Sequence, residues 1–299
     1  MNIKLIFLVL LFPFLLFANA QNEIRDSKEG LAIIYKKGLA SIDNKDVRLA
    51  VNLLQQEVFS KSKHKIITKF SNDLNSTIEN FQHAKIDIFS LDFIYYLKNY
   101  AKINPYIGGR WILLEKKDNK FREFFLIVNK KSAINSLKDL KSKTVGLVKN
   151  DSMQELYLDT LLLENVHQSS YKYLDKIKYY TKPSRALIKL FFNQIDACIV
   201  SKYTWNTAIE LNPQLEKKLK IIKRSQDIFP PVVLTVIHKK SPYFSKLYEE
   251  FVFTSQMNVK TKEILRMYQT VQSMKLTEND IDAILKYFNK YKKLKNKYQ

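Results

Sequence analysis

Several polar side chains stand where apolar segments of this chain give way to polar ones, and their types fit non-covalent binding of a small molecule. Ser152 and Gln154 follow one apolar segment, and Ser201 and Tyr203 follow another. In open α/β sheets, ligands bind outside the carboxyl ends of the strands. A helix that begins there offers unpaired backbone N–H groups and a positive dipole end. These residues predict a site for a small, often anionic, ligand.

Residues that perform covalent or metal chemistry are present but are not spaced for it. The chain has no G-x-S-x-G or H-E-x-x-H motif, and its four histidines stand alone at positions 64, 83, 167 and 238. Its one cysteine, Cys198, lies within the apolar run Ile195–Val200, which favours a buried side chain over a nucleophile. We expect no catalytic residue, no metal site and no cofactor, with an enzyme of unrecognised type as the alternative.

The composition indicates a globular protein with a strong positive charge. It has 299 residues, a formal net charge of +21 and 46% hydrophobic residues, enough for two domains with sizeable cores. Lysine is spread along the whole chain, so we interpret the charge as a bias of composition and expect no nucleic-acid partner. The five glycines form neither a G-x-G-x-x-G nor a Walker A motif, which excludes both nucleotide-binding loops in standard form.

The segment Met1–Ala20 has the pattern of a secretory signal peptide. Lys4 precedes an apolar run over 5–17, and Ala18-Asn-Ala20 supplies a small-x-small cleavage site. The apolar run is shorter than the ~20 residues that a membrane-spanning helix needs. We expect cleavage before Gln21 and a periplasmic location, with an uncleaved anchor as the alternative.

Behind the polar residues, apolar segments of strand length alternate with segments of helical period, which predicts parallel β-α-β units. Strands are expected at 31–37, 65–70, 86–90, 124–128, 144–148, 177–180, 195–200, 219–223 and 230–238, and helices at 44–61, 76–84, 92–100, 154–163 and 184–192. We expect a Gly-Gly-Arg turn and a hairpin-like stretch within 105–120, and helix throughout 241–299. The pair Ile-Asp at 86–87 recurs at 195–196, which indicates two similar lobes and a structural role for both aspartates.

The segment Phe121–Glu164 is similar to a known family. Its strand ends in Asn129-Lys-Lys-Ser132, and Ile134-Asn-Ser-Leu-Lys-Asp-Leu-Lys-Ser-Lys-Thr-Val-Gly146 follows. This order resembles the second lobe of type 2 periplasmic binding proteins, and most of all the phosphonate/phosphite/phosphate-type (PhnD-like) substrate-binding proteins of ABC transporters. The resemblance implies two lobes, each an α/β sandwich, joined by a two-strand hinge. It also implies extra C-terminal helices that pack on the first lobe.

The resemblance divides the chain into a signal peptide at 1–20, the first part of lobe 1 at 21–122, lobe 2 at 123–231, and the return strand and C-terminal helices of lobe 1 at 232–299. The ligand is then expected between the lobes. The residues expected to contact it are Tyr35, Ser90 and Tyr95 of lobe 1 and Ser152, Gln154, Ser201 and Tyr203 of lobe 2.

The loop that opens the first helix of lobe 2 departs from the family's pattern. In the family it typically reads Asn-Ser-Thr-Ser-Gly and holds an anion, whereas residues 151–155 here read Asp-Ser-Met-Gln-Glu. Met153 removes a hydroxyl donor, and Asp151 and Glu155 add negative charge beside the helix N-terminus. The resemblance implies the fold and a binding role, and leaves the identity of the ligand open.

The function that the resemblance implies is that of an exported monomer that captures a small, phosphonate- or phosphate-like anion between closing lobes. It delivers this ligand to an ABC permease in the membrane. No covalent step is needed, because differential binding shifts the population from open to closed forms. The alternative is a periplasmic sensing or scaffold module that serves a membrane receptor or kinase and has a weak transport role or none.

Overall fold

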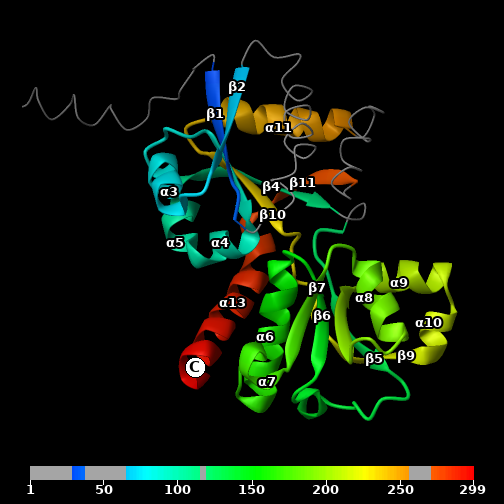
Figure 1. Ribbon diagram of the computed structural model, residues 1–299. Helices are drawn as coiled ribbons and strands as arrows, with labels where there is room; N and C mark the ends of the chain where they lie inside the picture. Colours follow the sequence, from blue (N-terminus) through cyan, green and yellow to red (C-terminus); the bar gives the residue numbers. More distant parts are fainter. Residues whose placement is uncertain (1–28, 38–64, 115–118, 256–270) are drawn as a thin grey trace, which may run out of the picture.

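The computed structural model describes residues 29–37, 65–114, 119–255 and 271–299 (Figure 1). The expected signal peptide and the expected helix at 44–61 lie outside these ranges. Within them the chain forms two α/β units, each built on its own sheet of parallel and antiparallel strands. The α/β class predicted from the alternating apolar segments is confirmed.

The first unit, lobe 1, contains a six-stranded sheet in the order β11-β4-β10-β3-β1-β2. Its strands are β1 (Glu29–Tyr35), β2 (Lys65–Ser71), β3 (Ile88–Asp92), β4 (Ile107–Leu114), β10 (Val233–His238) and β11 (Gln272–Leu276). Its helices are α3 (Leu74–Gln82), α4 (Phe93–Lys98), α5 (Tyr100–Ile103), the 3-10 turn Asn104–Tyr106 and α11 (Pro242–Ser255). β1 pairs in parallel with β2 and β3, whereas β10 runs antiparallel to β3 and β4.

Two strands of this sheet correct the sequence prediction. The sequence predicts a turn at Gly108-Gly109, but this segment is part of β4. The absence of a side chain at Gly109 permits close packing, because a Cβ there would lie 2.9 Å from Ser245 Oγ of α11. Likewise, β11 interrupts the stretch expected to be helical throughout, because its backbone pairs antiparallel with β4 over Gln272–Leu276.

The second unit, lobe 2, contains a five-stranded sheet in the order β7-β6-β8-β5-β9. Its strands are β5 (Phe124–Asn129), β6 (Thr144–Val148), β7 (Lys176–Tyr180), β8 (Ala197–Ser201) and β9 (Leu219–Arg224). Its helices are the 3-10 turn Leu137–Leu140, α6 (Ser152–Val166), α7 (Ser170–Tyr173), α8 (Pro183–Phe191), α9 (Lys202–Leu211) and α10 (Gln214–Lys218). β6 pairs in parallel with β7 and β8, and β5 runs antiparallel to β8 and β9.

The two aspartates of the repeated Ile-Asp pair perform the same structural task in the two lobes. The Asp87 carboxylate accepts the backbone N–H of Leu31 at 2.8 Å, and the Asp196 carboxylate accepts that of Thr144 at 2.8 Å. Each ties the loop before its own strand to the beginning of the neighbouring parallel strand. The structural role predicted for both residues is confirmed.

Two of the passages between the lobes in the described residues lie side by side. Arg122 and Phe229 form an antiparallel bridge, in which Arg122 N donates to Phe229 O at 2.7 Å. A two-strand connection of this kind permits bending while each lobe keeps its sheet.

The last helix, α13 (Glu278–Tyr298), contacts both lobes (Figure 1). Near its beginning, Glu278 forms an ion pair with Arg110 of β4 at 2.7 Å. Further along, Tyr291 donates to Asp159 of α6 at 3.1 Å, and the Tyr298 ring stacks on His167 with centroids 4.4 Å apart. The resemblance predicts that the final helices pack on lobe 1, but α13 leaves lobe 1 and follows α6 of lobe 2.

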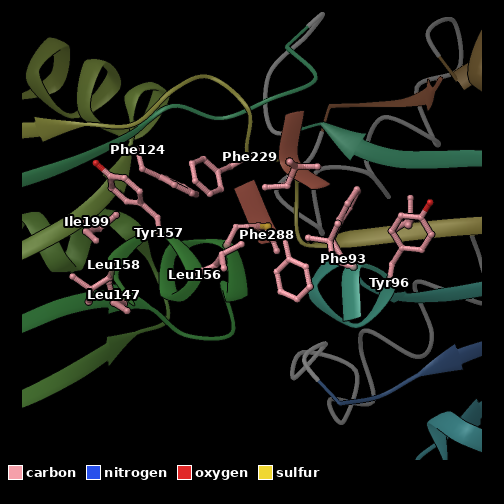
Figure 2. Packing of buried hydrophobic residues seen from close by; sticks show 14 of the residues in the cluster. Phe93, Tyr96, Phe124, Leu147, Leu156, Tyr157, Leu158, Ile199, Phe229 and Phe288 are labelled. Carbon is pink, nitrogen blue, oxygen red and sulfur yellow. The ribbon is translucent and has the colours of Figure 1, made fainter. Parts of the chain in front are cut away.

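An apolar interface joins the lobes beside α13. Phe229, on the second passage, lies with its ring centroid 5.0 Å from both Phe124 of β5 and Tyr287 of α13. Figure 2 shows Phe288 between this group and Phe93 of α4, and the Phe288 side chain is fully buried. One continuous cluster of buried residues therefore extends through both lobes.

Candidate ligand-binding site

The lobes also touch through polar groups, where β3 ends in lobe 1 and α6 begins in lobe 2. Asp92 is the N-cap of α4, and its Oδ1 accepts the backbone N–H of Ile94 at 2.9 Å. The same oxygen accepts the hydroxyl of Ser152, the first residue of α6, at 2.6 Å. Strand ends and helix starts of both lobes therefore meet at this point.

A cavity of about 320 Å³ opens beside this contact. It is lined from lobe 1 by α4, from lobe 2 by α6 and β7, and on one side by α13. Its polar lining side chains include Asp92, Tyr95, Ser152, Glu155, Tyr179 and Tyr291. The volume is at the lower end of the range for ligand sites, which suits a small ligand.

Negative charge is concentrated at one end of this cavity. Burial raises the pKa of Asp92 to about 7, and the nearby charges of Asp151 and Glu155 add to the shift, while hydrogen bonds from Ser152 and Ile94 oppose it. The pKa of Glu155 is also raised, mainly by partial burial, although a hydrogen bond from Tyr179 opposes this. A group that enters here meets carboxylates that are only partly compensated.

The N-cap side chain of α6 is itself a carboxylate. Its N-cap, Asp151, accepts the backbone N–H of Gln154 at 3.3 Å. The same carboxylate accepts both terminal nitrogens of Arg122, at 2.7 and 3.1 Å, and both side chains are buried. This guanidinium and this helix end, which are features that bind anions in other proteins, are occupied by Asp151.

The structure separates the residues that the sequence predicts for the site. Tyr95 and Ser152 line the cavity, and Tyr35 packs edge-on against Tyr95 with ring centroids 5.2 Å apart. Ser90 instead shares a hydrogen bond of 2.8 Å with Thr235 of β10. Buried Gln154 accepts the backbone N–H of Val148 at 2.9 Å and so holds the turn before α6.

Ser201 and Tyr203 line a second cavity, of about 450 Å³, beside the passages between the lobes. Ser201 caps α9 by accepting the backbone N–H of Thr204 at 3.2 Å. The neighbouring Lys202 forms an ion pair with Glu123 at 2.9 Å. The predicted binding residues of lobe 2 are therefore divided between two cavities.

Sequence reasoning missed Asp92, Glu155 as a lining residue, and Tyr179. A signal was available for Asp92, because an aspartate between a strand and a helix is a typical N-cap. Glu155 and Tyr179 gave no such signal, because only the fold brings the first turn of α6 beside the end of β7.

Other chemistry finds no support in the part of the chain that the structure describes. No group of three or more His, Cys, Asp or Glu side chains there is arranged to hold a metal ion. Cys198 is fully buried, and burial raises the pKa of its thiol. No helix in the described ranges is both long enough and apolar enough to cross a membrane.

Comparison with known proteins extends this picture. Residues 42–279 match the model of a family described as ABC transporter, phosphonate, periplasmic substrate-binding protein. The comparison with curated protein sequences found no match.

Three solved structures share the fold with low sequence identity. A binding-protein component of an ABC phosphonate transporter from Pseudomonas aeruginosa has a TM-score of 0.57 at 15% identity, covering 90% of this chain and 89% of that one. PhnD1 from Prochlorococcus marinus, in complex with methylphosphonate, has 0.56 at 14%, covering 89% and 99%. XAC2383 from Xanthomonas citri, bound to ATP, has 0.57 at 13%, covering 90% and 99%. The two-lobe, type 2 fold that the sequence predicts is confirmed.

Proposed function

This chain belongs to the family of periplasmic substrate-binding proteins of phosphonate ABC transporters, and we propose that it captures a small ligand between its two lobes and delivers it to a permease in the membrane. The observation that carries this proposal is the contact between Asp92 and Ser152, with a cavity beside it that both lobes line. A ligand bound there contacts both lobes at once.

Capture follows from differential binding. A ligand that reaches Tyr95 of lobe 1 and Ser152 of lobe 2 gains both sets of contacts only when the lobes are close together. It therefore shifts the population toward the closed form. We propose that residues 123–231 move as one body against the rest of lobe 1, with bending at Arg122 and Phe229, and that α13 then keeps its contacts with only one of the two bodies.

The test is a thermal-shift screen followed by small-angle scattering. The panel contains phosphate, methylphosphonate, sulfate, small carboxylates, amino acids and amines. A ligand at a hundredfold over its dissociation constant stabilises the protein by about 2.7 kcal/mol. The hit should also reduce the radius of gyration. Stabilisation without compaction would contradict capture by closing lobes.

Ser152→Ala is the matched substitution for the site, and Ser184→Ala is its control. Both serines lie in the first turn of a lobe 2 helix, but Ser184 is exposed on α8, away from the cavity. We expect Ser152→Ala to weaken binding about 3- to 10-fold, the cost of one hydrogen bond. Equal affinities for the two variants would remove Ser152 from the site.

The docking partner is decided by a separate measurement. Affinity purification of the native protein from membranes should recover a permease, as in the family. Recovery of a receptor or kinase ectodomain without a permease would instead support a sensing module with the same fold.

A further inference from the structure

We propose that the cavity between α4, α6, β7 and α13 binds a small organic cation with a protonated amine, rather than a tetrahedral anion. This inference rests on the proposed function, because it names the ligand class of the same site. It follows from three observations: the state of the helix end, the free oxygen of Asp92, and the aromatic lining.

The helix end of lobe 2 already carries negative charge from the protein itself. The Asp151 carboxylate caps α6 and holds Arg122 through two hydrogen bonds, so the buried positive charge nearest the helix end is already neutralised. Ser152, the hydroxyl that an anion would use, donates to Asp92 instead. An incoming phosphonate would have to displace two carboxylates of the protein, and these remain nearby to repel it.

Asp92 points an unused acceptor at the cavity. The residue is 1% exposed and lines the cavity, and both of its hydrogen bonds end on Oδ1. No donor among the described residues reaches Oδ2. Because Oδ2 is not among the fully buried atoms, it is open to the cavity, where an ammonium N–H can replace water and supply both a hydrogen bond and the compensating charge.

Aromatic rings complete a setting suited to a cation. Tyr95 and Tyr179 line the cavity together with Asp92 and Glu155, and Tyr179 donates to Glu155. The electron-rich faces of tyrosine rings attract cations within about 6 Å. The chain already shows this preference, because Lys98 Nζ lies 5.4 Å from the centroid of Tyr95.

The positive charges of two lysines offset the negative charge of the cavity only weakly. Lys98 and Lys295 line the cavity, but both side chains are exposed, and Lys295 Nζ donates to Tyr291 at 3.2 Å. Exposed charges are screened by water and salt, whereas the charge of buried Asp92 is not. At pH 7.5, above its pKa of about 7, Asp92 is mostly ionised, and its buried charge then favours a cation.

Titration calorimetry of the purified full protein at pH 7.5 tests the inference. The amine probes are putrescine and ethanolamine, and the anion probes are methylphosphonate and inorganic phosphate. The wild type should bind an amine and neither anion. Asp92→Asn keeps an N-cap acceptor but removes the charge. It should weaken amine binding about 30-fold or more, as for a buried charge left unpaired.

Glu155→Gln provides a second variant that does not disturb the core, because Glu155 is exposed in the first turn of α6. We expect it to weaken amine binding about threefold. Glu216→Gln is the matched control, since Glu216 is an exposed glutamate in the first turn of α10, outside the cavity. It should bind like the wild type. Equal losses for the two glutamine variants would overturn the assignment of the site.

The outcomes separate this inference from the proposed function. Binding of methylphosphonate or phosphate without amine binding would overturn the cation and leave ligand capture standing. Amine binding that Asp92→Asn does not weaken would also overturn it, because the amine would then lie elsewhere. If neither the amines nor the anions bind the folded wild type, the cation inference fails. Whether the lobes close on another ligand is then decided by small-angle scattering with the hits of the thermal-shift panel.

Discussion

The two lobes meet at two places of opposite character. Beside α13 the contact is apolar, with Phe124, Phe229, Tyr287 and Phe288 packed in one continuous cluster. At the cavity the contact is polar and consists of the hydrogen bond between Asp92 and Ser152. The first contact stabilises the arrangement of the lobes without a ligand. The second contributes little to stability and presents groups that a ligand can use.

This difference restricts how the protein can open. Lobes with a large apolar interface do not move freely, whereas small polar interfaces permit motion. Because α13 holds Arg110 through Glu278 and Asp159 through Tyr291, opening must either carry α13 with one lobe or break one of these contacts. We expect the polar side to open first.

The largest loss of stability is expected from Phe288→Ala, which weakens the apolar contact between the lobes. Removing this buried ring should lower the free energy of unfolding by about 4 kcal/mol, through lost burial and the cavity left behind. Urea denaturation measures it. Phe192→Ala is the control, because Phe192 is 62% exposed and should cost little. Similar losses for both variants would mean that α13 does not hold the lobes together.

A slightly smaller loss is expected from Asp151→Asn, near the polar side. The change keeps the N-cap of α6 but removes the negative charge that faces buried Arg122, which should cost about 3 kcal/mol of unfolding free energy. Glu249→Gln breaks the exposed pair with Lys275 and should cost under about 1 kcal/mol. Urea denaturation that finds the two losses equal would contradict the importance of burial at Arg122.

The contribution of Asp92 to the free energy of unfolding should depend on pH. Because the pKa of Asp92 is raised to about 7 in the folded state, its protonated form is favoured there. Its contribution to stability is complete below the unfolded pKa near 4 and is lost as the pH rises through about 7.

The loss between pH 5 and pH 7 should be about 2 kcal/mol in the wild type and absent in Asp92→Asn. The charges of Asp151 and Glu155, which face Asp92 from α6, remain in both proteins. The difference between the two urea-denaturation profiles therefore isolates Asp92. Parallel profiles would show that Asp92 is not buried between the lobes.

The smallest effect is expected from Tyr291→Phe, which removes one polar contact from the otherwise apolar side. Loss of the hydrogen bond to Asp159 should cost about 1 kcal/mol, because Ser170 still donates to the same carboxylate. Thermal unfolding measures it. A loss as large as that of Phe288→Ala would show that α13 is held by this bond rather than by packing.

Much of the fold could be predicted from local patterns. The run at 124–128 is continuously apolar and forms the buried strand β5, and the run at 144–148, apolar after Thr144, forms β6 with a buried centre. The helix predicted over 184–192 is confirmed as α8 (Pro183–Phe191), and α13 begins at a capping box between Thr277 and Asp280, a spacing that can be read in the sequence. Each of these signals lies within a few residues of the structure that it predicts.

The rest depended on contacts that no local pattern encodes. β4 and β11 are strands because they pair with each other, although their segments lie far apart in the sequence. The path of α13 along α6 is fixed by packing between lobes. In the site, the hydrogen bond joins Asp92 and Ser152, which lie 60 positions apart in the sequence. Each residue taken alone indicates only the start of a helix.

The most direct test of the account is the proton balance of ligand binding at pH 6, measured by calorimetry with putrescine in buffers of different ionisation enthalpy. At this pH Asp92 is mostly protonated, given a pKa of about 7. An ammonium group that binds at Asp92 favours the ionised carboxylate, so binding should release most of one proton. Proton uptake, or no exchange at all, would contradict a ligand amine held by Asp92 between the lobes.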